Sequence, residues 1–215
     1  MSKSRQQLIA ELSGDLRHSP RAGRTADMAA YWLMFNFIIA ALLIYLTGPF
    51  RAGSLEQMLV HPQFLFESVT GLAAIIMLAM TAVRSGIPSN STRLKRFLPA
   101  LLLISIWLGF YVVGIWTPAL EPSREGARQS HCYLETVFYG LPSLILGLYI
   151  IRRLWPLNGA WTGLMVGLAA GATPALLMQF ACMYMPVHII TSHLLPGLLL
   201  GVVGLFAGRI YLKRR

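Results

Sequence analysis

The chain has 215 residues, of which 56% are hydrophobic and only 12% are charged, and its mean hydropathy is +0.61. Soluble domains carry about a quarter of charged residues, so this composition excludes an ordinary soluble domain and indicates a membrane protein. The formal net charge of +10 lies in short clusters between apolar runs. It therefore indicates membrane topology and no direct contact with nucleic acid.

The N-terminal 27 residues are polar and contain a short amphipathic pattern. Its apolar side chains recur at helical spacing and predict one face of a short helix that Pro20 ends: Leu8, Ile9, Leu12 and Leu16. Such a helix could have one of three roles. It could lie on the membrane, cap the bundle, or dock in a groove of a cytoplasmic partner. No cleavage site follows the first apolar run, so that run is expected to stay in the mature protein.

Six apolar runs are long enough to cross about 30 Å of hydrocarbon, which takes roughly 20 residues each. They predict an all-α, polytopic membrane domain over residues 28–215, preceded by a cytoplasmic segment over residues 1–27. The six predicted spans are Met28 to Thr47, Phe64 to Val83, Phe97 to Thr117, Cys132 to Ile151, Ala160 to Ala181 and Ile190 to Leu212.

The basic residues predict the orientation of these spans. With six spans, 15 of the 18 Lys and Arg residues fall on one side, and only Arg51, Arg124 and Arg128 fall on the other. Lys and Arg accumulate in cytoplasmic loops, so both termini are expected in the cytoplasm. We expect a bacterial inner membrane protein whose outer face is the periplasm.

The two cysteines of the chain are predicted to lie together at the periplasmic end. Cys132 begins the fourth span and Cys182 ends the fifth, and a short cytoplasmic turn joins these two spans. At about 1.5 Å per residue both thiols rise to a similar depth, and packed helices lie about 8 to 10 Å apart. The pair is therefore expected to share a metal ion or, after modest movement, to form a disulfide.

Further metal-ligating side chains map to the same boundary. Thiolate, thioether and imidazole groups together favour soft or borderline metals such as Cu(I) or Zn(II), and Cys132 and Cys182 are the main candidate ligands. The weaker candidates are His131, Met183, Met185, His188 and Glu135, and His61 and His193 lie at the same level. The competing interpretation is that both cysteines are small buried hydrophobes and that the methionines fill space.

Glycines repeat every four residues in the last two spans, for example at Gly163, Gly167 and Gly171. Small residues at this spacing let membrane helices approach closely. We interpret them as structural contacts.

The chain combines five features: the LIAELSGDL segment, six spans, a Cys at the start of the fourth span, the WTGLMVGLAAGATPALLMQFACM run that ends in the second Cys, and the basic tail GRIYLKRR. In this combination it resembles the NrsF-type membrane anti-sigma factors. The resemblance covers essentially the whole chain. It implies a protein that holds an extracytoplasmic-function sigma factor inactive at the membrane, with two periplasmic-side cysteines needed for the response to heavy metals. It implies sigma-factor contacts at Leu8, Ile9, Leu12, Asp15 and Leu16 and places the metal response, most simply to copper, at Cys132 and Cys182.

Other classes of function have less support. A thiol redox enzyme would use the same two cysteines, but no CxxC motif supplies an exchange partner. A small transporter would need polar groups at mid-membrane, where the spans offer little beyond Asn36, Ser105, Thr173 and Gln179. Nucleotide-binding motifs are absent from the sequence, and Ser143 lacks the context of a hydrolase nucleophile. We expect no enzymatic activity and no required cofactor.

Overall fold

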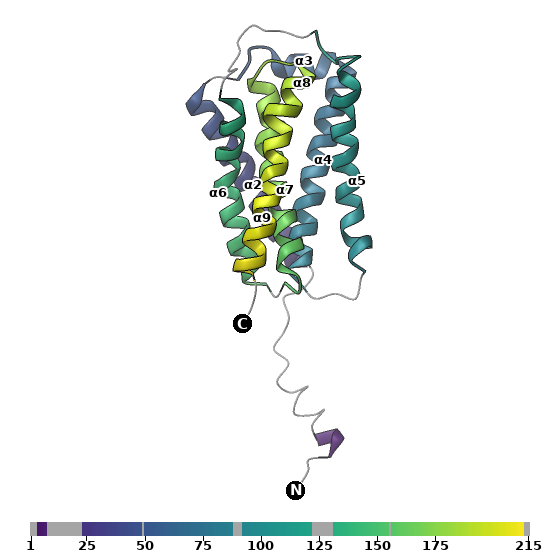
Figure 1. Cartoon of the computed structure of the whole chain (residues 1–215), viewed down its shortest axis with the longest axis vertical. Helices are drawn as coiled ribbons and strands as arrows, with labels where there is room; N and C mark the ends of the chain where they lie inside the picture. Colours follow the sequence, from purple (N-terminus) through teal and green to yellow (C-terminus); the bar gives the residue numbers. More distant parts are fainter. Residues whose placement is uncertain are drawn as a thin grey trace.

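The structure is a computed structural model, and it describes residues 4–7, 23–48, 50–87, 92–121, 131–154 and 156–212. Regular structure in these ranges is helical, and the long helices form one upright bundle (Figure 1). The predicted sigma-factor contacts Leu8, Ile9, Leu12, Asp15 and Leu16 lie outside the described residues.

Six helices in the described ranges are long and apolar enough to cross a membrane. The helices are α2 (Gly23–Thr47), α3 (Ser54–Val60), α4 (Pro62–Ser85), α5 (Arg93–Gly114), α6 (Cys132–Arg152), α7 (Gly159–Ala181), α8 (Pro186–Ile189) and α9 (Leu195–Tyr211), with a π-helical turn, η1 (Ile190–Leu194), between α8 and α9. The helices α8, η1 and α9 run on without a break, so Pro186–Tyr211 forms the last span. The predicted number of spans is confirmed.

Helix α7 is the centre of the bundle. The most apolar stretch of α7 is 89% buried, against 28% for those of α2 and α5, and α7 packs against α2, α4, α6 and α9. Helix α2 begins, and helix α9 ends, at one end of the bundle, whereas α3 and α8 lie at the other (Figure 1). We call the latter the cysteine end, because both Cys132 and Cys182 lie there.

Glycines on α7 and α9 let the two backbones touch. A Cβ atom added to Gly163 would collide with the carbonyl oxygen of Gly204, and one added to Gly167 would collide with that of Leu200. Because lipid gives no hydrophobic drive for packing, close approach of this kind is a main source of helix association in membranes. The α7–α9 pair therefore forms a rigid unit that carries Cys182 at one end.

Several boundaries differ from the predicted ones by a few residues; for example, the first span begins at Gly23 and not at Met28, and the third at Arg93 and not at Phe97. The last span begins at Pro186, earlier than the predicted Ile190, because a proline is tolerated in the first turn of a helix, where its missing N–H is not needed. The third span ends at Gly114, before the predicted Thr117. His188, which the sequence places between two spans, thus belongs to the last one.

Candidate functional site

The two cysteines meet at the cysteine end, as predicted. Their sulfur atoms lie 3.4 Å apart, no disulfide joins them, and each residue is only 1% exposed. Cys132 is the first residue of α6, and Cys182 follows the last residue of α7. The N-terminus of α6 carries a partial positive charge, which favours negative charge on the Cys132 sulfur.

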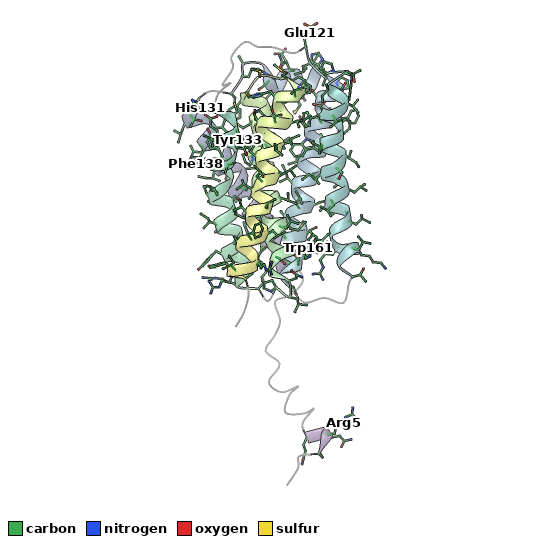
Figure 2. All side chains as sticks on the ribbon, in the orientation of Figure 1. Arg5, Glu121, His131, Tyr133, Phe138 and Trp161 are labelled. Carbon is green, nitrogen blue, oxygen red and sulfur yellow. The ribbon has the colours of Figure 1, made fainter. Side chains whose placement is uncertain are left out.

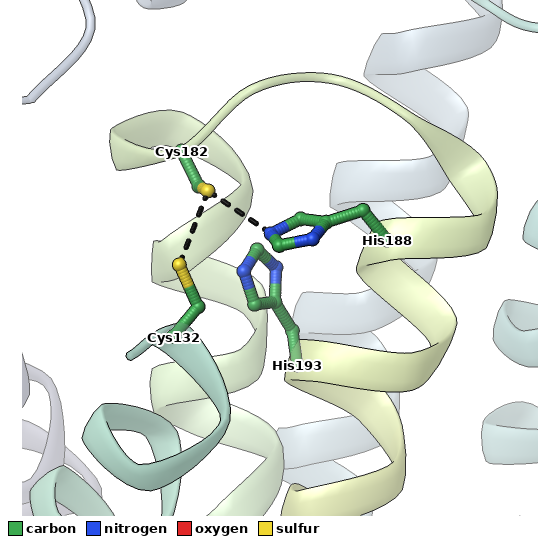
Figure 3. A group of neighbouring side chains, drawn as sticks. All are labelled: Cys132, Cys182, His188 and His193. Carbon is green, nitrogen blue, oxygen red and sulfur yellow. Dashed lines mark hydrogen bonds between the residues drawn. The ribbon is translucent and has the colours of Figure 1, made fainter. Parts of the chain in front are cut away.

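Two histidines from the last span complete a compact group with the cysteines (Figure 3). The Nε2 atom of His188 lies 3.2 Å from the Cys182 sulfur, and the rings of His188 and His193 meet edge to face with 5.0 Å between centroids. One ligand atom from each of the four residues lies within 4.8 Å of the other three. We call Cys132, Cys182, His188 and His193 the Cys–His cluster.

The π-helical turn η1 positions both histidines. In an α-helix, residues five apart point about 140° away from each other, since each residue turns the chain by about 100°. In η1 the N–H of Leu195 bonds to the carbonyl of Ile190, five residues earlier, and this wider turn brings His188 and His193 onto one side. Turns of this kind occur mostly as single insertions inside α-helices and are frequent at functional sites.

The other predicted ligands lie outside the Cys–His cluster. His131 is exposed at the outer side of α6 (Figure 2). Met183 and Met185 pack in the same small apolar core as the cysteines. Glu135 lies one turn into α6 and acts electrostatically on His193.

The loop after α2 anchors the backbone of Cys182. Arg51 donates a hydrogen bond from Nη1 to the Cys182 carbonyl at 3.1 Å, and its backbone N–H donates to the carbonyl of Phe180 at 2.9 Å. Hydrogen bonding with Cys132 is the main cause that lowers the pKa of Cys182, and His188 acts in the same direction, while burial acts against them. The site therefore favours the thiolate, the form that binds metal.

A second polar group involves Tyr184, two residues after Cys182. Glu67 of α4 is fully buried, and the hydroxyl of Tyr184 lies 2.8 and 3.1 Å from its two carboxylate oxygens. Burial and the nearby Glu67 carboxylate raise the pKa of Tyr184, so the hydroxyl keeps its proton and donates it. This bond ties the segment after Cys182 to α4.

Deeper in the bundle, Gln179 of α7 continues these polar contacts. Its amide nitrogen donates to the Ser68 hydroxyl at 3.0 Å, and its amide oxygen accepts a hydrogen bond from Tyr111. All three side chains are buried. The end of α7 is therefore held to both α4 and α5 by hydrogen bonds that lipid cannot replace.

Sequence reasoning missed His193 as a ligand. It placed His193 at the periplasmic boundary but gave it no ligand role. In a regular α-helix the two histidines would point away from each other, and no residue pattern reveals a π-helical turn. The available signal was the spacing of three titratable or thiol side chains, Cys182, His188 and His193, within twelve residues of an apolar chain.

Comparisons with known proteins identify the family of this chain. The model of the family described as "Negative regulator of sigma F" (NrsF) matches residues 12–213. The Anti-sigma-F factor NrsF of Caulobacter vibrioides (strain NA1000 / CB15N) is 27% identical over 183 residues, which cover 81% of this chain and 84% of that protein. No solved structure matches significantly. Because the family model spans nearly the whole chain, from before the first span to the end of the last, this protein belongs to the NrsF family of anti-sigma factors.

Proposed function

We propose that this protein holds an extracytoplasmic-function sigma factor inactive at the cytoplasmic face of a bacterial inner membrane, and releases it when a thiophilic metal such as copper binds at Cys132 and Cys182. The observation that carries this proposal is the 3.4 Å contact between two buried thiols from different spans in a chain of an anti-sigma family.

The ends of the bundle give the signal a direction. The Cys–His cluster lies at one end, and the predicted sigma-binding segment, Leu8 to Arg21, precedes α2, which begins at the other end (Figure 1). With the orientation predicted from the basic residues, the Cys–His cluster binds metal on the periplasmic side, and the N-terminal segment binds the sigma factor on the cytoplasmic side. The signal must then cross the membrane through the spans.

Movement between α6 and α7 is the proposed link. The two cysteines belong to these two helices, so a metal ion that binds both sulfurs fixes the relative position of the helices at the cysteine end. Pro142 and Pro174 lie inside the same two helices, where each removes a backbone hydrogen bond and permits bending. A shift of the sigma-binding equilibrium from 1:99 to 99:1 needs about 5.5 kcal/mol of preference for the releasing state, which must come from the metal–thiolate bonds.

Cells that carry a reporter for the sigma factor test this proposal. Cys132→Ser and Cys182→Ser keep the side-chain size and remove the thiolate, and both are expected to abolish induction by metal while repression without metal persists. His131→Ala is the matched control, because His131 is exposed next to Cys132 and outside the Cys–His cluster. Full metal induction in both serine variants would contradict the proposal.

Thiol labelling in the same cells separates metal ligation from disulfide formation. If the metal is bound by thiolates, a chelator is expected to restore labelling of both cysteines. If the metal instead promotes a disulfide, only a reductant restores it.

A further inference from the structure

The spacing of the four ligand atoms in the Cys–His cluster is close to that of a tetrahedral metal centre. With Zn–S bonds of about 2.3 Å and Zn–N bonds of about 2.0–2.1 Å, a tetrahedral ion holds two sulfurs about 3.8 Å apart and a sulfur and a nitrogen about 3.6 Å apart. The two cysteine sulfurs lie 3.4 Å apart, and the Cys182 sulfur lies 3.2 Å from Nε2 of His188. Outward shifts of a few tenths of an ångström would admit the ion.

His193 has no other evident task. Its side chain is fully buried, and outside the Cys–His cluster neither ring nitrogen makes a hydrogen bond to any residue that the structure describes. A buried polar group without a partner costs free energy, so its retention calls for an explanation. Its ring lies against His188 and its ligand nitrogen lies within 4.8 Å of both sulfurs, which is where a metal ligand belongs.

The surroundings of His188 also match those of a metal ligand. Ligating histidines usually hold their second ring nitrogen in a hydrogen bond, which fixes the ring orientation. The Nδ1 atom of His188 lies 3.4 Å from the Ser192 hydroxyl, which leaves Nε2 facing Cys182. The Ser192 carbonyl in turn accepts a hydrogen bond from Thr136 of α6 at 3.2 Å.

Charge decides between a divalent and a monovalent ion. Two thiolates and two neutral imidazoles around a divalent ion give a neutral complex, whereas Cu(I) would leave a net charge of −1. Net charge in a buried site is expensive. The two charged side chains that act on the cluster electrostatically, Arg51 and Glu135, have opposite signs and do not favour either choice.

From these observations, we propose that His188 and His193 complete a four-coordinate centre with Cys132 and Cys182 that takes a tetrahedral divalent ion, Zn(II) or Cd(II). The inference rests on the proposed function for its role as a sensor, and it replaces copper with a divalent ion as the metal that the sensor binds. Binding joins α6, α7 and the η1 turn at one ion, and each thiol that is still protonated releases its proton to solvent as its metal–sulfur bond forms. The last span thereby becomes part of the sensor.

Cobalt(II) added to the purified, detergent-solubilised full chain tests the coordination directly. We expect one ion per chain, a thiolate-to-cobalt charge-transfer absorption, and the intense d–d bands of a four-coordinate ion. His188→Gln with His193→Gln is expected to keep the charge-transfer absorption, lose the four-coordinate bands, and weaken binding by at least the 10- to 100-fold that loss of an outer-shell partner costs. His131→Gln should bind as the wild type does.

X-ray absorption on the zinc-loaded wild-type protein makes the test independent of how the variants fold. A first shell of two sulfurs and two nitrogens is expected. A shell with two sulfurs and no histidine nitrogen, unchanged cobalt binding in the double variant, or binding of Cu(I) with none of Zn(II) or Cd(II), would each overturn the inference. Because none of these measurements involves a sigma factor, their outcome is separate from that of the reporter experiment.

Discussion

At the scale of single residues, the cysteine end combines a candidate metal site with a buried, hydrogen-bonded carboxyl group. The candidate metal ligands come from α6, from the end of α7 and from the last span, while Tyr184, two residues after Cys182, bonds to the buried Glu67. Gln63 donates a further hydrogen bond to Glu67, at 3.4 Å. The position of Cys182 therefore depends on polar contacts that are not themselves ligands.

The Tyr184–Glu67 pair is expected to stabilise the fold as a unit. Tyr184→Phe leaves a buried carboxyl group without its best donor, and we expect a loss of about 1–3 kcal/mol in the free energy of unfolding. In the double variant with Glu67→Met, both polar partners are replaced by apolar groups, which is close to neutral. The double variant should therefore lose less than the sum of the two single variants.

Denaturant titration of the purified protein in detergent measures these free energies. The two single variants and the double variant form a cycle that isolates the coupling between the two side chains. Strictly additive losses would show that the two side chains act independently and would contradict this interpretation.

At the scale of elements, the sequence predicts the spans and the level of the cysteines well. The spans follow from the lengths of the apolar runs, and the level of each cysteine follows from its residue count along a helix. The close contact of the glycine-bearing faces of α7 and α9 was likewise predictable from four-residue spacing. The seven-residue α3 was not predicted, since Ser54–Val60 is too short to give a periodic signal. The joint position of His188 and His193 was not predictable either, because it depends on one π-helical turn that the neighbouring helices support.

The contact between α7 and α9 gives a prediction for glycine variants. Gly167→Ala forces a methyl group against the backbone of Leu200 and Gly201, and overpacking of this kind costs about 1–3 kcal/mol. Gly109→Ala is the matched control in α5, because a Cβ atom there meets no other atom within 4 Å. It should be neutral or stabilising by up to about 1 kcal/mol, since alanine favours the helix.

Thermal unfolding of both variants in the same detergent provides the comparison. We expect a lower midpoint for Gly167→Ala and an unchanged or higher one for Gly109→Ala. Equal midpoints would show that the α7–α9 backbone contact does not limit stability.

At the scale of the whole molecule, the architecture separates two tasks. The cysteine end carries the candidate metal ligands, and the opposite end carries the start of α2, which the predicted sigma-binding stripe precedes (Figure 1). The central helix α7 connects the two ends, packs against α2, α4, α6 and α9, and bonds to α5 through Gln179. A movement at Cys182 can therefore be transmitted along the buried helix α7 to the opposite end. Because α7 and α9 are in close contact, the last span moves with α7.

Capture of the sigma factor on the purified wild-type protein, with and without micromolar copper, zinc or cadmium, tests the central claim most directly. Leu12→Asp with Leu16→Asp places charge in the predicted apolar stripe and serves as the control for binding, whereas Cys182→Ser serves as the control for sensing. We predict that the wild type retains the sigma factor without metal and loses it with metal, that the stripe variant never retains it, and that Cys182→Ser retains it under both conditions. Retention by the wild type regardless of metal, or equal release from Cys182→Ser, would contradict the account.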